Sequence, residues 1–147
     1  MYLLDTNHCS RIIQGDSAIV DRIFQVGESA VSTCVIVRGE LLYMVYKSER
    51  KDTNLARVRS FLEDIQIYSI DEATADIYGQ LKADIFERFG PKDKRKQRRT
   101  RLEHLGISEN DLWIAAIALR NRLTIISSDR DFQRIQMVAT LSLESWI

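Results

Sequence analysis

The sequence predicts an α/β fold in which a mostly parallel sheet lies between layers of helices. Two short apolar runs, residues 2–4 and 123–126, are each followed closely by an acid, Asp5 and Asp129 respectively. Neither run alternates between apolar and polar residues, which is typical of strands covered on both faces, although the first run is short enough to begin a buried helix instead. Helix-like segments separate the runs, and this alternation of strands and helices favours a parallel sheet.

Size and composition fit a globular protein with one core. The 147 residues lie near the common size of a single domain, so we expect one domain over residues 1–147. Apolar residues make up 45% of the chain and charged residues 29%, which argues against a disordered protein. No apolar run approaches the roughly 20 residues that cross a bilayer, and no secretory leader precedes the first predicted strand. We therefore expect a cytoplasmic protein with no membrane contact.

Cysteine and histidine are too few and too scattered to suggest a zinc site or a disulfide framework. Cys9 and Cys34 lie 25 positions apart without a Cys-x-x-Cys motif, and His8 and His104 are not at ligand spacing. We expect both cysteines to be small core residues and His8 to be an ordinary helix residue.

Helical spacing and breaker residues divide the first half of the chain. We expect helices to about Ile13, to about Val26 and over residues 34–47, with a strand at 30–32. Thr33 is the expected cap of the third helix, whose nearly uniform apolarity predicts a largely buried helix. Glu40 interrupts that helix on the face shared by Ile36, Val37, Tyr43 and Met44, so it is either a surface residue or an inward carboxylate that needs a partner.

The second half continues the alternation. We expect helices at 55–64, from Asp71 to about Phe89, from Ser108 to about Asn121 and at 130–135, with strands at 65–68 and 123–126. Gly90 and Pro91 end the second of these helices. The tail, residues 137–147, reads as one or two short edge strands with Trp146 packing at the end.

Three acids follow predicted strands or begin helices, and each has a purely structural interpretation. Asp5 and Asp129 can cap the helices that follow them, and Asp111 has capping-box spacing from Ser108. Strand carboxyl ends and the following helix N-termini nevertheless share one edge of a parallel sheet, so these carboxylates are expected to converge. Clustered carboxylates repel one another unless a cation neutralises them, and oxygen donors without histidine or cysteine favour Mg²⁺ or Mn²⁺ over zinc.

A basic run interrupts an otherwise acidic chain. Residues 88–101 contain eight Lys and Arg residues against one acid, an excess of seven positive charges in a chain of net charge zero. Such a run is either a solvated loop or helix extension, or a contact for a polyanion, and the sequence leaves both open.

Four motifs in this order resemble the PIN-domain family, and within it the VapC-type toxin ribonucleases of bacterial toxin–antitoxin pairs. The motifs are Leu3–Asn7, Arg38–Leu42, Ser108–Ala116 and Ile126–Phe132, and their order and spacing match over essentially the whole chain. The resemblance implies a PIN-like three-layer sandwich with a mainly parallel sheet of about five strands. It also implies Mg²⁺- or Mn²⁺-dependent hydrolysis of an RNA phosphodiester.

The same resemblance implies roles for individual residues. Asp5 and Asp111 would be the principal metal ligands, with Glu40 and Asp129 holding metal directly or through water; Asp129, not Asp131, matches the family position. Residues expected to bind carboxylates, phosphate or the RNA backbone are Thr6, Ser127, Lys94, Arg95, Arg98 and Arg99. A homodimer is implied, as is a VapB-like antitoxin whose C-terminal segment would occupy the acidic groove. The segments Ile19–Phe24 and Leu55–Leu62 could supply apolar surface for these contacts.

Three other functions are compatible with parts of this pattern. A catalytically inactive PIN-like module would bind RNA or protein, but it would be expected to lack one of the four acids. A phosphoryl-transfer enzyme with Asp5 as nucleophile usually has a second Asp two residues later, where this chain has Asn7. A DNA-specific nuclease would use the same metal chemistry, because discrimination comes from contacts to the 2′-OH and from strand shape.

Overall fold

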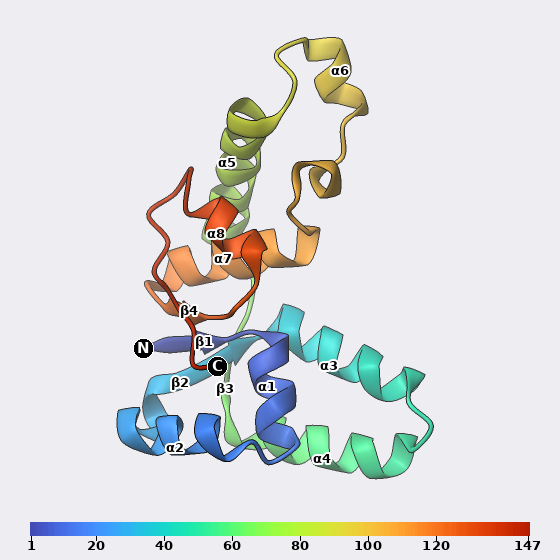
Figure 1. The fold of residues 1–147 in the computed structure, drawn as a ribbon, viewed down its shortest axis with the longest axis vertical. Coiled ribbons are helices and arrows are strands. Elements are labelled where there is room, and N and C mark those ends of the chain that lie inside the picture. Colours follow the sequence, from blue (N-terminus) through green and yellow to red (C-terminus); the bar gives the residue numbers. More distant parts are fainter.

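A five-stranded sheet, parallel throughout, forms the centre of the molecule in our computed structural model, which describes residues 1–147 (Figure 1). The strand order is β3-β2-β1-β4-β5. The strands are β1 (Tyr2–Leu4), β2 (Val31–Cys34), β3 (Gln66–Tyr68), β4 (Thr124–Ile126) and β5 (Leu143–Glu144). The predicted α/β class and mainly parallel sheet are confirmed.

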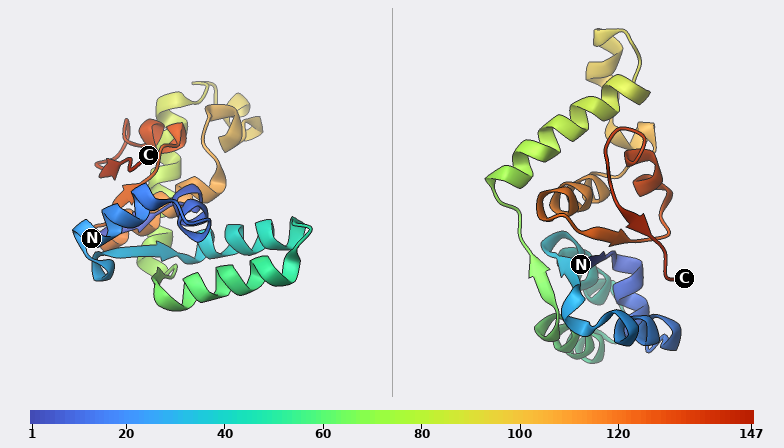
Figure 2. Two further views of the ribbon diagram at one scale, coloured as in Figure 1. Left: turned by 60° about the horizontal axis from the view of Figure 1, so that its bottom comes forward. Right: turned by 90° about the vertical axis from the view of Figure 1, so that its left-hand side faces the viewer.

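Helices cover both faces of this sheet. In chain order they are α1 (Thr6–Ile13), α2 (Ser17–Val26), α3 (Val35–Lys47), α4 (Lys51–Asp64), α5 (Glu72–Phe89), α6 (Lys94–Arg99), α7 (Glu109–Asn121) and α8 (Arg130–Ile135), with short 3₁₀ turns η1 (Glu28–Ala30) and η2 (Leu102–Leu105). Figures 1 and 2 show α5, α7 and α8 on one side of the sheet and α1, α2 and α4 on the other. No helix combines the length and the apolarity needed to cross a bilayer.

The middle strand β1 is buried on both faces, as its uninterrupted apolar sequence predicts. Leu3 and Leu4 are fully buried, and Leu4 pairs in register with Ile126 of β4. On the other side, the Ser32 and Thr33 hydroxyls donate hydrogen bonds of 2.7 and 3.0 Å to the carbonyls of Tyr2 and Leu4. These two polar side chains are buried at little cost because each has a backbone acceptor.

The expected cap of α3 was wrong. Thr33 belongs to β2, which continues to Cys34. Its hydroxyl donates a hydrogen bond to the Leu4 carbonyl of β1 and does not cap the helix. Cys34 occupies the N-cap position without a side-chain hydrogen bond. Strand pairing was therefore extended by two residues beyond the prediction, which moved the start of the helix.

The expectation that α3 is largely buried was also wrong. Val37, Leu41 and Val45 are buried on one stripe, whereas Tyr43 and Tyr46 are 63% and 57% exposed. Helix α3 extends past the sheet and packs along α4, so only one stripe meets the core (Figure 1). The next helix also begins earlier than predicted, because α4 starts at Lys51 instead of Leu55.

The remaining elements follow the predicted order, including a short strand in the tail with Trp146 packed at its end. The basic run contains the short helix α6, which Asp93 caps by accepting hydrogen bonds from the Arg95 and Lys96 amides. The tail strand, β5, is parallel to β4, and Trp146 packs edge-on against Tyr2 with ring centroids 5.2 Å apart.

Candidate active site

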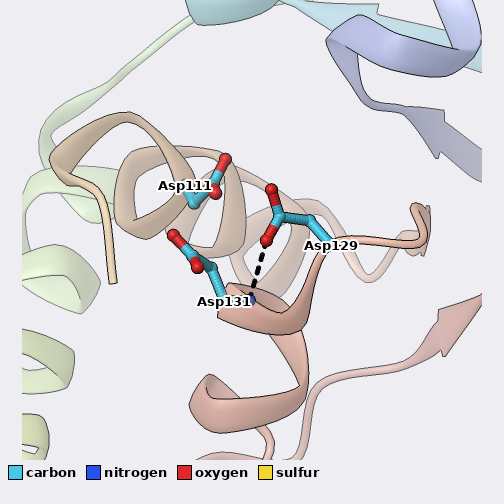
Figure 3. Close-up of side chains that lie close together, drawn as sticks. All are labelled: Asp111, Asp129 and Asp131. Atoms are coloured by element: carbon cyan, nitrogen blue, oxygen red, sulfur yellow. Dashed lines mark hydrogen bonds between the residues drawn. The ribbon is translucent and has the colours of Figure 1, made fainter. Parts of the chain in front are cut away.

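Three carboxylates converge beyond the carboxyl end of β4. Asp111 lies in the first turn of α7, Asp129 caps α8, and Asp131 lies in the first turn of α8. One oxygen of each lies within 4.8 Å of the others (Figure 3). The predicted convergence of Asp111 and Asp129 is thus present, and Asp131 joins them.

Hydrogen bonds from serines and backbone amides fix these acids. The Ser108 hydroxyl accepts a 3.1 Å bond from the Asp111 amide, while the Ser108 amide donates a 2.8 Å bond to Asp131 Oδ2. The Asp129 amide donates to the Ser127 hydroxyl at 3.0 Å, and Asp129 Oδ1 accepts from the Asp131 amide at 2.9 Å. Ser108 therefore joins the N-termini of α7 and α8.

This crowding has a clear electrostatic consequence. Burial raises the pKa of Asp111 to about 8, assisted by its hydrogen bond with Asp131 and by the charges of Asp129 and Asp131. A carboxyl with such a pKa holds a proton at neutral pH when no cation is present. A divalent cation would replace that proton, so the all-oxygen trio fits Mg²⁺ or Mn²⁺.

Asp5 lies at the same edge of the sheet, one strand away. Its amide donates to the Ile126 carbonyl at 3.2 Å, so Asp5 extends the β1–β4 ladder to the residue before Ser127. Its side chain is buried and caps α1 by accepting from the His8 amide at 2.8 Å. Asp5 is not one of the three acids that meet within 4.8 Å.

Glu40 is tied to the strand end that carries Asp5. The half-buried carboxylate accepts a 2.7 Å hydrogen bond at Oε1 from the Thr6 hydroxyl. Thr6 and Glu40 line a groove that also reaches Asn110, the neighbour of Asp111. The groove places Glu40 between α1 and the start of α7, outside the carboxylate trio.

Comparison with known proteins identifies the family. The profile described as "PIN domain" matches residues 2–137. The chain belongs to the PIN-domain family. Ribonuclease VapC2 from Rickettsia felis is 30% identical over 151 residues, covering 99% of this chain and 98% of the relative. The tRNA(fMet)-specific endonuclease VapC from Shigella flexneri is 27% identical over 146 residues, covering 99% and 97%. This PIN domain is therefore of the VapC type.

Solved structures agree with this assignment. VapBC2 from Rickettsia felis, bound to a DNA fragment from its promoter, contains a chain that is 26% identical, with a TM-score of 0.77 and coverage of 99% and 98%. DNA-bound VapBC from Salmonella typhimurium has the same fold, with 22% identity, a TM-score of 0.79 and coverage of 99% and 98%. The PIN-like sandwich expected from the sequence is confirmed.

One residue next to the acids of this PIN domain had no predicted role. His8 was expected to be an ordinary helix residue, but it is fully buried and its Nδ1 lies 2.8 Å from Asp5 Oδ1. Its Nε2 is buried without a hydrogen-bond partner. The three-residue spacing from a capping Asp was the available signal for this contact.

The cysteines of the PIN domain are core residues, as predicted. Cys9 and Cys34 are fully buried. Burial raises the pKa of Cys9 far above its ordinary value and raises the pKa of Cys34 to about 11. Both thiols therefore stay protonated, and neither can act as a thiolate nucleophile or ligand.

The structure separates the predicted RNA-binding residues into two groups. Thr6 and Ser127 lie beside the acids, through their bonds to Glu40 and to the Asp129 amide. The basic candidates lie on or at the end of α6, beyond the far end of α5, and are not brought together with the acids: Lys94, Arg95, Arg98 and Arg99 (Figure 1).

Proposed function

We propose that this PIN domain, acting as a single domain over residues 1–147, is a divalent-metal-dependent endoribonuclease toxin. It hydrolyses RNA phosphodiester bonds and is neutralised by a VapB-like antitoxin. The carboxylate trio with its protonated Asp111 carries the proposal, because a bound cation would relieve the repulsion among these carboxylates. The VapC names of the relatives support the choice of RNA.

The proposed metal ligands are acids from separate elements. Asp5 and Asp111 would be the principal ligands of Mg²⁺ or Mn²⁺, with Glu40 and Asp129 binding it directly or through water. Asp131 lies close enough to Asp111 to join them. When bound, the cation lowers the pKa of water and neutralises the charge that develops at phosphorus during in-line displacement.

The surrounding polar residues would orient these acids. Thr6 holds one oxygen of Glu40, so that the other stays free to accept a proton or a ligand. Ser127 holds the Asp129 amide, and Ser108 holds the first turns of α7 and α8 together. Fixed donors of this kind reduce the reorganisation needed when charge develops at the phosphate.

The antitoxin would bind where the acids need a positive partner. Solved VapBC complexes of the same fold support a VapB-like partner for this chain. We propose that its C-terminal segment lies in the groove between Thr6, Glu40 and Asn110 and places a basic side chain near the acids. We also propose a homodimer in the cytoplasm.

The test is cleavage of total bacterial RNA by antitoxin-free protein with Mg²⁺, with Mn²⁺ and with EDTA. Discrete fragments should require metal and disappear in Asp5→Asn and Asp111→Asn. Asp21→Asn, an exposed acid of α2, serves as the matched control and should cleave normally. Intact RNA in every reaction, or equal cleavage by all variants, would instead favour an inactive RNA- or protein-binding module. Matched single-stranded DNA tests the DNA-nuclease alternative.

A further inference from the structure

The basic arm, defined here as residues 88–101 with α6 near its tip, carries charges that the protein itself does not neutralise. Its eight Lys and Arg side chains are all exposed. The salt bridges of the molecule lie elsewhere, in the pairs Asp5–His8, Arg11–Asp16, Lys82–Glu109 and Asp71–Arg120. The one acid of the arm, Asp93, is occupied as the cap of α6. Like charges at this density repel one another unless an anion lies against them.

The arm is held firmly at its base. The Arg134 guanidinium lies 4.4 Å from the centre of the Phe89 ring, where α5 ends. Arg134 Nε also donates a 2.9 Å hydrogen bond to the Leu105 carbonyl, on the returning segment. Leu102 and Leu105 are buried in the core. Arg134 belongs to α8, so the arm has a fixed position relative to Asp129 and Asp131.

The arm lies some distance from the acids along α5. Lys82 in the middle of α5 lies 2.6 Å from Glu109, at the start of α7. Asp111 follows two residues later, so the acids lie beside the middle of α5 and not beside its end. Helix α5 continues from Lys82 to Phe89, a rise of roughly 10 Å at 1.5 Å per residue. Figures 1 and 2 show α6 beyond that end, projecting away from the sheet. A phosphate on the arm is therefore not the phosphate at the acids.

The composition of the arm fits a nucleic acid and not a protein partner. Residues 92–101, Lys-Asp-Lys-Arg-Lys-Gln-Arg-Arg-Thr-Arg, include no apolar or aromatic side chain. Protein interfaces usually have an apolar core, whereas phosphate binding needs only clustered cations that release counterions. The rest of the chain carries an excess of seven negative charges and repels RNA. Electrostatic attraction of RNA must therefore come from the arm.

We propose that the basic arm binds RNA phosphates several nucleotides away from the bond that is cut. The arm then supplies affinity for long RNA, while the acids at the sheet edge supply the chemistry. RNA as the ligand rests on the proposed ribonuclease function, but binding by the arm can be measured without cleavage. A short oligonucleotide makes fewer phosphate contacts with the arm than a long RNA does, so it gains less affinity from it.

The experiment compares two variants that each lose the same charges. The arm variant carries Lys94→Gln, Arg95→Gln, Arg98→Gln and Arg99→Gln; glutamine is a good helix former, so α6 is retained. The matched control carries Lys51→Gln, Arg50→Gln, Arg57→Gln and Arg59→Gln, which are exposed residues at and in α4. Fluorescence anisotropy in EDTA measures binding of a labelled single-stranded RNA of about 30 nucleotides and of one of about five, across a salt series.

The arm variant should bind the long RNA about tenfold or more weakly than wild type, and the slope of log K against log salt should fall by up to about 2.8, or about 0.7 per lost phosphate contact. The preference for long over short RNA should shrink with it, while the control keeps that preference. Equal binding by wild type and arm variant, or an equal loss in the control, would overturn the proposal. So would an arm variant that binds RNA normally but no longer binds the antitoxin. Wild type that binds long RNA through the arm yet cuts no RNA would contradict only the ribonuclease function.

Discussion

His8 donates two hydrogen bonds to one carboxylate oxygen of Asp5: its backbone N–H and its ring Nδ1 each lie 2.8 Å from Oδ1. Both bonds are buried. Oδ1 is thereby occupied, and Oδ2 is the oxygen left for a cation. His8 therefore fixes the orientation of a carboxylate that we propose as a metal ligand, although its spacing does not suggest that His8 is a ligand itself.

Replacing His8 tests this orientation directly. His8→Leu removes the ring donor, and we expect Mn²⁺ affinity to fall by about 10- to 100-fold, as is usual when a residue supporting a metal ligand is lost. His8→Asn can place an amide N–H near the position of Nδ1 and should retain most of the affinity. Titration calorimetry measures both, with circular dichroism to verify folding. Equal Mn²⁺ affinity in wild type and a folded His8→Leu would show that Asp5 needs no such support.

The Thr6–Glu40 hydrogen bond of 2.7 Å joins α1 to α3 and can be isolated by a double-mutant cycle. Thr6→Val keeps the shape of the side chain but removes the donor, so it should lower the free energy of unfolding by about 1 kcal/mol. Thr6→Ser should keep the donor and most of the stability. In urea unfolding, Thr6→Val should cost much less free energy when Glu40 is already Ala, because alanine has no acceptor for the hydroxyl. Additive effects of the two substitutions would contradict a shared bond.

The raised pKa of Asp111 predicts how stability depends on pH in the metal-free protein. Its folded pKa of about 8 exceeds the ordinary value of 3.8, so the folded state holds an extra proton between these values. The free energy of unfolding contributed by this group therefore falls as pH rises from about 4 to about 8. Asp111→Asn lacks the ionising group, so its stability advantage over wild type should grow across this window by at least about 1.4 kcal/mol, the value of one pKa unit.

Urea unfolding at several pH values between about 5 and 8, in EDTA, measures the difference. Asp21→Asn provides the control, because this exposed acid lies away from the site and should track wild type at every pH. A constant difference between Asp111→Asn and wild type would mean that Asp111 ionises normally.

Local sequence patterns predicted the strands and the positions of the acids well. Buried strands such as residues 2–4 and 123–126 are apolar runs with clear ends, and an acid after such a run falls at the sheet edge whatever else it does. Ser108 and Asp111 illustrate this most clearly. The capping interaction expected from their spacing is present, and it is the same interaction that fixes Asp111 beside Asp129. The capping role of this pair is therefore compatible with the metal-binding role proposed for Asp111.

Features that depend on distant neighbours could not be predicted in this way. The sequence of α3 is apolar on nearly every side, yet which side is buried depends on where α4 and the sheet lie. The place of Asp131 in the carboxylate trio depends on the Ser108 amide, 23 residues earlier. That amide donates to the Asp131 carboxylate and holds it near Asp111. Arg134 likewise meets Phe89 and Leu105 only in the folded chain.

The same proton on Asp111 should make metal binding depend on pH. A cation must displace that proton, so its apparent affinity should rise about tenfold per pH unit below the pKa and level off above about 8. Mn²⁺ titration calorimetry in buffers of different ionisation enthalpy would also report the release of about one proton per ion below that pH. In Asp111→Asn both the pH dependence and the proton release should disappear, together with most of the affinity. Affinity that stays constant from about pH 6 to 8 would mean that the cation displaces no proton from Asp111.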